Sequence, residues 1–209
     1  MATETAVSLA RARRGMVIAA AGCGKTEVIA EAVSLGDEGR ELVLTHTHAG
    51  VKALGQRLAK FKVSRKRCHV DTIAGWALNY AVHYPKLSGL EGKEPTGAAW
   101  AQVYDAATRA LDSAAVRRVV TESYAGLYVD EYQDCTAGQH RLILKLADIL
   151  PCRILGDPLQ GIFGFGEDRL VDWTSDVEAN FDRLPDLTFP WRWETKNAAL
   201  GRRLMEVRE

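Results

Sequence analysis

Small residues surround a lysine and a threonine near the start of the sequence. The stretch Ala19-Ala20-Ala21-Gly22-Cys23-Gly24-Lys25-Thr26 follows a short apolar run. Backbone N–H groups of such a loop, together with the positive end of a helix dipole, favour a bound phosphate. The spacing fits G-x-x-x-x-G-K-[ST] except that Ala19 takes the first place. Lys25 is therefore predicted to reach the β- and γ-phosphates of a nucleoside triphosphate, and Thr26 to ligate Mg²⁺. A strand-to-helix turn with an ordinary surface lysine is the alternative.

Two carboxylates follow a second apolar run. Asp130 and Glu131 come directly after Leu127-Tyr128-Val129. An acidic residue at the end of a strand beside a phosphate loop can hold Mg²⁺ through water, and we assign that role to Asp130. Glu131 is predicted to polarise the attacking water as a general base. An acidic helix start is the alternative, because carboxylates favour helix N-termini.

A glutamine ends a third segment of this kind. Gln160 closes the stretch Gly156-Asp157-Pro158-Leu159-Gln160. A neutral amide at this place can sense a γ-phosphate or orient a water molecule. The alternative is a simple Gly-Asp-Pro turn.

Strands and helices must alternate to bring these segments together. Apolar runs predict one strand that begins at residue 16. They predict five more strands, which span 41–45, 68–71, 125–130, 152–157 and 187–189. Helical periodicity covers 5–13, 25–35, 51–61, 72–80, 98–111, 114–123, 138–150 and 194–207. Such alternation predicts an α/β fold with a parallel sheet flanked by helices. No strand is predicted within 85–123, which we interpret as a small helical insertion.

Composition limits the class of protein. The 209 residues predict one domain, and 47% hydrophobic residues are enough for a sizeable core. The 27 basic and 27 acidic residues balance, so net charge neither favours nor excludes nucleic acid. Four widely spaced cysteines form no C-x-x-C pair and predict reduced thiols in the cytoplasm. No apolar run is long enough to span a membrane, and the apolar run after Arg14 continues into the phosphate loop, unlike a signal peptide.

Five segments together resemble the N-terminal RecA-like domain of UvrD/Rep-type superfamily 1 DNA helicases. The family patterns A-x-A-G-x-G-K-T, L-T-F-T-N-x-A, D-E-[YF]-Q-D, G-D-x-x-Q-S-I-Y and N-Y-R-S correspond in order to residues 19–26, 44–49, 130–134, 156–163 and 189–193. The pair Asp130-Glu131-Tyr132-Gln133-Asp134 and Gly156-Asp157-Pro158-Leu159-Gln160 is the most specific part.

The resemblance implies a P-loop NTPase of the RecA-like type that binds ATP and Mg²⁺. Its RecA-like ATP-binding domain would comprise 1–84 and 124–209, with 85–123 inserted. The resemblance also implies that Arg192 contacts the γ-phosphate. The expected function is an ATP-hydrolysing motor domain of a DNA helicase.

Single-stranded DNA is the partner that the resemblance implies. Phe163 and Phe165 would stack on bases, at about 1–3 kcal/mol per base, unless they pack in the core. The phosphate contacts would come from Thr45, Thr47, His48 and Thr72. Trp76 is as readily a core residue as a DNA contact, and His46 and His48 read as solvated loop residues rather than metal ligands. The basic run 60–67 could hold phosphates or simply be solvated.

The sequence also departs from the family. No glutamine precedes Gln56, whereas the family reads adenine with an upstream glutamine. The family's T-F-H segment is Thr72-Ile73-Ala74 here, without the histidine. The second RecA-like domain does not follow Arg192. Either a partner chain supplies it or these residues are a fragment of a longer product, and in both cases this chain alone is not expected to unwind DNA. Two rival functions are a P-loop phosphotransferase and a non-motor module whose binding of DNA or protein is switched by nucleotide.

Overall fold

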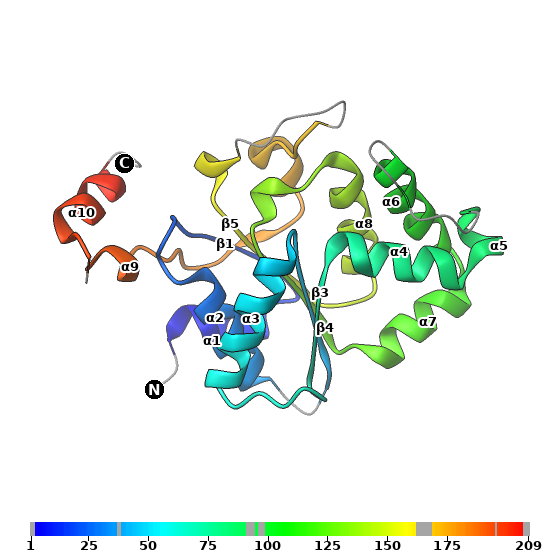
Figure 1. The fold of residues 1–209 in the computed structure, drawn as a ribbon, viewed down its shortest axis with the longest axis horizontal. Helices are drawn as coiled ribbons and strands as arrows, with labels where there is room; N and C mark the ends of the chain where they lie inside the picture. Colours follow the sequence, from blue (N-terminus) through cyan, green and yellow to red (C-terminus); the bar gives the residue numbers. More distant parts are fainter. Residues whose placement is uncertain are drawn as a thin grey trace.

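A six-stranded sheet forms the centre of the molecule (Figure 1). The computed structural model describes residues 3–36, 39–90, 95, 99–161, 169–194 and 196–206. The strand order is β3-β2-β4-β5-β1-β6, and every pair is parallel. The strands are β1 (Arg14–Ile18), β2 (Glu41–Thr45), β3 (Cys68–Thr72), β4 (Gly126–Val129), β5 (Cys152–Gly156) and β6 (Asp182–Arg183). The predicted α/β fold with a parallel sheet is confirmed, and the segments that follow the strands meet at one edge, here called the carboxyl edge.

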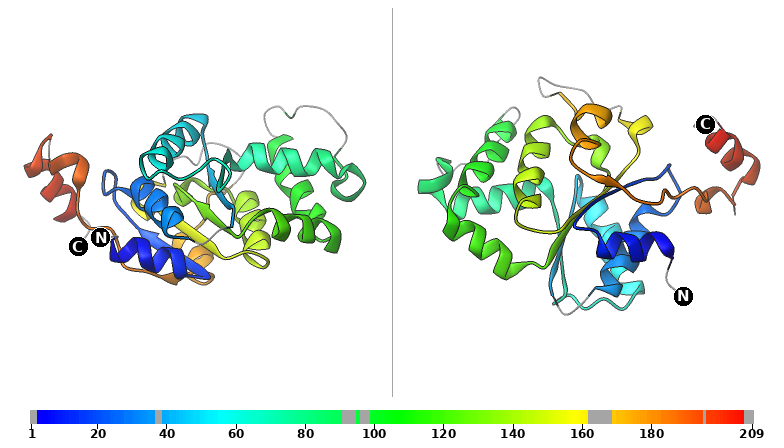
Figure 2. Two further views of the ribbon diagram at one scale, coloured as in Figure 1. Left: turned by 90° about the horizontal axis from the view of Figure 1, so that it is seen from below. Right: turned by 180° about the vertical axis from the view of Figure 1, so that it is seen from behind.

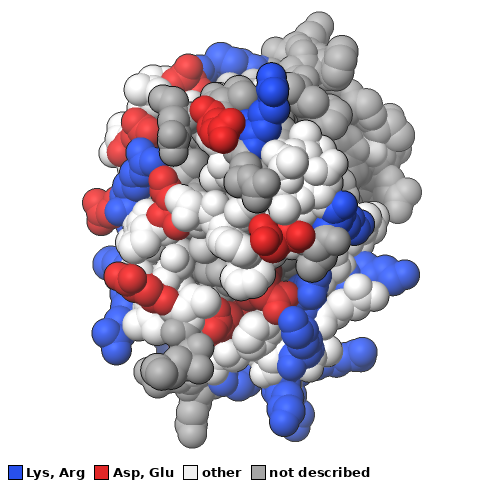
Figure 3. All heavy atoms as spheres, turned by 90° about the vertical axis from the view of Figure 1, so that its left-hand side faces the viewer, with Lys and Arg blue, Asp and Glu red and all other residues white. Residues whose placement is uncertain are grey.

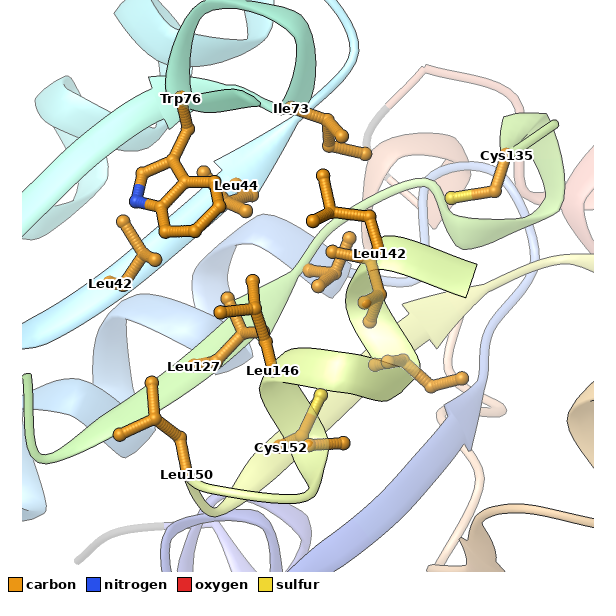
Figure 4. Packing of buried hydrophobic residues seen from close by; sticks show 14 of the residues in the cluster. Leu42, Leu44, Ile73, Trp76, Leu127, Cys135, Leu142, Leu146, Leu150 and Cys152 are labelled. Carbon is orange, nitrogen blue, oxygen red and sulfur yellow. The ribbon is translucent and has the colours of Figure 1, made fainter. Parts of the chain in front are cut away.

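Helices cover both faces of the sheet, because side chains along a buried parallel strand alternate between two apolar layers. Val43 and Tyr128 point to one face, where α1 (Glu4–Arg11), α2 (Lys25–Leu35) and α3 (His48–Lys60) pack. Leu44 and Leu127 point to the other face. That face is covered by α4 (Ile73–His83), α6 (Ala99–Ala110), α7 (Ala114–Ser123) and α8 (Ala137–Ala147). Figure 4 shows Trp76 of α4 and Leu146 of α8 in this second layer.

The described helices within 85–123 share the core of the sheet. The short helix α5 (Pro85–Ser88) leads toward α6 and α7. Val103 of α6, Val116 of α7 and Leu111 between them belong to the same buried cluster as Leu44 and Leu127. The insertion therefore packs as part of one core, and its division from the rest at 85–123 stays a prediction.

The remaining helical elements lie in the loops after β4 and β5 and in the part of the chain that follows β6. They are the 3-10 turns Tyr132–Asp134 and Pro158–Gln160, the π-helical turn Trp173–Val177, α9 (Trp191–Glu194) and α10 (Ala198–Glu206). Figure 2 shows α10 at the end of the molecule opposite α5, α6 and α7. No helix of the described ranges is both long and apolar enough to cross a bilayer.

Three predicted boundaries are wrong. Helix α3 begins at His48 rather than Val51, because the Thr47 hydroxyl accepts a hydrogen bond from the Gly50 N–H (3.0 Å) and caps the helix there. The predicted strand 187–189 is only an isolated bridge between Leu187 and Ala19, and the sixth strand lies earlier, at β6. The predicted helix 194–207 is split into α9 and α10, and residue 207 lies outside the described part of the chain.

Candidate active site

The predicted phosphate loop joins β1 to α2. Gly22 (φ +85°) and Gly24 (φ +90°) both adopt left-handed backbone conformations that disfavour other residues. Helix α2 starts at Lys25 without a side-chain cap. The first N–H groups of an uncapped helix are available to an anion. This helix start forms part of the wall of a cavity of about 810 Å³. The cradle therefore fits the phosphates of a nucleotide.

Lys25 is held inside this cavity by two oxygen atoms. Its side chain is only 6% exposed. The ammonium donates to the backbone carbonyl of Ala19 (Nζ–O 3.2 Å) and forms an ion pair with Glu131 (Nζ–Oε2 3.2 Å). Because a buried ammonium is costly unless it is paired, these contacts fix the position of the charge. The fold thus joins the lysine of the loop after β1 to the glutamate that follows β4.

Thr26 and Asp130 meet beside this ion pair. The Thr26 hydroxyl donates to the Asp130 carboxylate (Oγ1–Oδ2 3.2 Å). Burial, together with the charge of Glu131, raises the pKa of Asp130 to about 6, and Lys25 opposes the shift. A hydroxyl and a carboxylate are oxygen ligands of the kind that Mg²⁺ takes when it keeps several waters. Elsewhere in the described ranges no three His, Cys, Asp or Glu side chains gather as a metal cage.

Glu131 has an unusual backbone conformation. Its φ is +55°, in the left-handed region that non-glycine residues seldom adopt. Several bonds hold it there: its N–H donates to Asp130 Oδ1 (3.0 Å), its carbonyl accepts from the Asp134 N–H (3.1 Å), and Gln133 Nε2 donates to its Oε2 (2.9 Å). A strained residue held by so many bonds is a candidate for function.

A hydrogen-bonded chain leads from Glu131 to Gln160. Gln133 bonds Glu131 through its amide nitrogen, and its amide oxygen accepts from the Asp157 N–H (3.0 Å). The buried carboxylate of Asp157 accepts from the Leu159 N–H (3.2 Å) and from the Gln160 side-chain amide. Gln160 lines the cavity. Gln133 had no predicted role beyond its place in the motif. In the structure it links the segment after β4 to the segment after β5.

The segment around α9 forms another wall of the cavity. The Arg192 N–H donates to the Gly22 carbonyl (3.1 Å), and the Trp193 indole donates to the Ala21 carbonyl (3.2 Å). Trp191 and Arg192 line the cavity, and Trp191 is 64% exposed. Sequence reasoning missed Trp191, although an aromatic residue beside a predicted phosphate ligand is a usable signal. Figure 3 shows the face that carries α9 and α10, where basic and acidic side chains are interspersed.

The predicted DNA contacts divide into exposed and buried residues. Thr47 and His48 are exposed at the start of α3. Thr45 and Thr72 are buried, and the Thr72 hydroxyl caps α4 by accepting from the Gly75 N–H (2.9 Å). Phe163 and Phe165 lie outside the described residues.

The structure defines the surroundings of two further side chains, Trp76 and His46. Trp76 is 1% exposed and is a core residue. The prediction that His46 is a solvated loop residue is wrong: it is partly buried, its Nε2 lies 3.7 Å from Cys135 Sγ, and burial lowers its pKa to about 4.

Part of the basic run 60–67 is already occupied. Lys60 forms an ion pair with Glu27, and Arg67 donates to the Gly36 carbonyl (2.7 Å). Lys62, Arg65 and Lys66 are exposed. The run is therefore at most a small basic surface.

Comparison with known proteins adds one match. The model of a family described as an AAA domain matches residues 3–166. The matched range contains the phosphate loop, Asp130, Glu131 and Gln160, and it ends before Arg192. No curated protein matches the chain.

Proposed function

The chain belongs to the AAA domain family, and from that premise we propose that it is the ATP-binding and ATP-hydrolysing motor domain of a UvrD-like DNA helicase. Membership in this P-loop family implies nucleotide binding and hydrolysis. The single observation that supports the finer proposal most is the convergence of Lys25, Thr26 and Glu131 on one cavity, with Asp130 hydrogen-bonded to Thr26.

ATP and Mg²⁺ fit the residues of the cavity. In the proposal, Lys25 and the N–H groups at the start of α2 bind the phosphates, while Thr26 and Asp130 hold the metal. When bound, Mg²⁺ neutralises negative charge on the phosphate oxygens. Lys25 is paired with Glu131 in the ligand-free protein (3.2 Å). Phosphate binding would therefore exchange a carboxylate partner of the lysine for a phosphate partner.

Glu131 is proposed as the general base. Lys25 and Gln133 both bond Oε2, so we assign the proton taken from water to Oε1. The side chain of Glu131 is 40% exposed, which lets water reach it. The chain through Gln133 and Asp157 would keep Gln160 in register with this carboxylate. Gln160 is proposed to orient water, and Arg192 to contact the γ-phosphate.

Single-stranded DNA is the proposed partner at the carboxyl edge of the sheet. Exposed Thr47 and His48 support this placement, and Phe163 and Phe165 remain proposed stacking residues. A chain that carries a second RecA-like domain is the other proposed partner. Because an arginine supplied from outside a P-loop site is worth about 10³–10⁵ in rate, we propose that this chain alone hydrolyses ATP slowly and does not unwind duplex DNA.

ATP turnover with and without single-stranded DNA tests the proposal. We expect slow release of inorganic phosphate, stimulated by an oligothymidylate and raised further by a polypeptide carrying a second RecA-like domain. Phosphate transfer to an acceptor other than water would overturn hydrolysis as the reaction and favour a phosphotransferase. ATP-dependent DNA binding without turnover would overturn the motor proposal in favour of a nucleotide-switched binding module.

A further inference from the structure

A second, smaller cavity lies beside β3, which stands at one end of the strand order. Its volume is about 240 Å³, and it shares no lining residue with the cavity of about 810 Å³ at the phosphate loop. Its walls come from β3, from α4, from Val119 of α7 and from Tyr124, which directly follows that helix. None of the residues that line it has a role in the proposed function.

Aromatic side chains line this cavity: Trp76, Tyr80, Tyr84 and Tyr124. Trp76 and Tyr80 are stacked, with ring centres 4.1 Å apart and planes inclined by 24°. Tyr84 follows along α4, and its ring centre lies 6.2 Å from that of Tyr80. The indole nitrogen of Trp76 is buried, so this side chain backs the cavity and offers no donor to it. Because the faces of aromatic rings are partially negative, rings that surround one cavity favour a cation.

Asp71 is the acidic side chain of this cavity, and no lysine or arginine lines it. The Asp71 Oδ1 accepts a hydrogen bond from the Thr72 N–H (2.7 Å). Its Oδ2 lies 4.0 Å from Nε2 of His69, and Nδ1 of that ring is bonded to the Tyr124 hydroxyl (2.7 Å). Burial and the charge of Arg40 lower the pKa of His69. The imidazole is therefore neutral at pH 7 and does not neutralise the carboxylate.

Charge decides which kind of ligand suits this cavity. A nucleotide would bring phosphate close to Asp71, and the wall holds no lysine or arginine to bind that phosphate. A purely apolar group would displace water from the carboxylate and leave it without a partner, which is costly. A cation satisfies both the rings and the carboxylate. One of the rings already has a cation beside it, because the Arg40 guanidinium lies 5.9 Å from the centre of the Tyr124 ring.

We propose that this cavity binds an alkylated ammonium group, which lies against the rings of Tyr80, Tyr84 and Tyr124 and takes Asp71 as its counter-ion. A guanidinium pairs best with both oxygens of a carboxylate, but Oδ1 of Asp71 is already bonded to the Thr72 N–H. An ammonium group with alkyl substituents needs only the free oxygen and the ring faces. Such a group occurs on free small molecules and on methylated lysine side chains. The site is separate from the nucleotide cavity and does not depend on ATP hydrolysis.

Titration of the full chain with choline, followed by NMR spectroscopy, tests the site. The indole N–H signal of Trp76 is the reporter, because this side chain backs the cavity. Choline should shift the signal to saturation, and its uncharged isostere 3,3-dimethyl-1-butanol should bind at least about 2- to 5-fold more weakly. Equal affinity for the two compounds would overturn the proposal, since the cavity would then select apolar volume. Tighter binding of thymidine or deoxyadenosine than of choline would overturn it in favour of a nucleobase site.

Two variants separate the charge from the rings. Asp71→Asn keeps an acceptor for the Thr72 N–H and removes the charge, so the affinity for choline should fall about 3- to 5-fold. Tyr84→Leu keeps an apolar side chain and removes a ring, and should cost about 2- to 5-fold. Asp105→Asn, in an exposed ion pair outside the cavity, is the matched control and should not change the affinity. Should Tyr84→Leu fail to fold in a thermal melt, Val119→Lys replaces it, because a cation on the exposed α7 wall should abolish binding. Wild-type affinity in Asp71→Asn would overturn the proposal.

A short glycine- and serine-rich peptide that contains trimethyllysine distinguishes the two sources of the cation. If the ligand is a modified protein, this peptide should bind at least about 10-fold more tightly than choline. If the ligand is a free small molecule, the peptide and choline should bind alike. Tighter binding of the same peptide with unmodified lysine would overturn the requirement for an alkylated ammonium group.

Discussion

Two ion pairs, each with a buried cation, lie near opposite edges of the same sheet. Lys25 and Glu131 meet at the carboxyl edge (3.2 Å), and Glu41 and Arg153 meet toward the amino ends of β2 and β5 (3.8 Å). Each pair joins segments far apart in the sequence. Only the pair at the carboxyl edge borders the cavity of about 810 Å³.

The ion pair between Glu41 and Arg153 is buried, and the protein's own groups surround the arginine. Arg153 donates to the carbonyls of Ala12 (2.7 Å) and Ala10 (2.8 Å), and its guanidinium lies 5.0 Å from the centre of the Tyr128 ring. Both partners are at most 10% exposed, whereas Glu131 of the other pair is 40% exposed. Arg153 thus ties α1 to the sheet and presents no charge to a ligand.

The comparison shows how a buried charge that stabilises the fold differs from a buried charge at a functional site. Glu41 and Arg153 sit in regular strands. Lys25 instead follows a left-handed glycine, and Glu131 is itself left-handed. A buried charge alone is a weak sign of a functional site. The sign is stronger where the buried cation has an exposed partner, where the partner's backbone is strained and where both line a cavity.

Lys25→Ala should have the largest effect on function and little effect on folding. Removal of the ammonium leaves a phosphate site without its principal positive charge, so ATP binding and turnover should fall below detection. Calorimetric titration with ATP and a thermal melt measure the two properties. Lys86→Ala, an exposed lysine of α5, is the matched control. A folded Lys25→Ala protein with wild-type affinity would remove the distinction between the two ion pairs.

Glu131→Gln should slow hydrolysis by roughly 10²–10⁴-fold and leave Mg·ATP bound, because the substitution removes the proposed base and leaves Asp130 in place. Single-turnover kinetics and nucleotide titration check the two parts. Glu41→Gln at the amino end is the matched control and should turn over ATP at the wild-type rate. Equal rates for wild type and Glu131→Gln would show that another residue acts as the base.

Arg153→Met should destabilise the fold by about 3–5 kcal/mol, because it leaves Glu41 buried without its cation. Urea unfolding measures the loss. The double variant Glu41→Gln with Arg153→Met should recover part of the stability, since no buried charge is then unpaired. Turnover per folded molecule should stay unchanged in both. A single variant as stable as the wild type would mean that Arg153 contributes no net stability.

Acid should weaken the carboxyl edge through His46. Its folded pKa of about 4 lies below the ordinary 6.5, so its contribution to stability is complete above pH 6.5 and is lost as pH falls toward 4, by about 3 kcal/mol. The groups facing it are Glu131 and Cys135. Burial raises the pKa of Glu41, so the amino-end carboxyl has the opposite sign and contributes more as pH falls.

The difference between wild type and His46→Phe isolates this contribution, because Asp130 and Glu41 titrate in both. Urea midpoints between pH 7 and pH 4 should converge for the two proteins as the pH falls. Parallel pH profiles would show that His46 is not kept neutral by the fold.

Local signals in the sequence predicted the phosphate loop and several elements. Helix α2 (Lys25–Leu35), strand β2 (Glu41–Thr45) and helix α7 (Ala114–Ser123) have the predicted bounds, because glycines and polar residues mark their ends. The loop was predictable because its chemistry resides in consecutive residues.

Features that depend on contact through space were not predictable. The left-handed Glu131, the bond from the Asp157 N–H to Gln133 and the bond from Trp193 to Ala21 each join segments whose proximity only the fold creates. His46 was misassigned for the same reason, since a polar residue between two elements gives no sign of the thiol that lies beside it.

The position of β1 in the sheet also sets the order of events during synthesis. β1 is made before the other five strands of this sheet, yet its two neighbours, β5 and β6, are made only after β2, β3 and β4. Contacts between such distant segments form late and slow the folding of a domain. The phosphate loop therefore lacks its neighbouring strands until β5 and β6 have been made, and nucleotide should slow unfolding without accelerating folding.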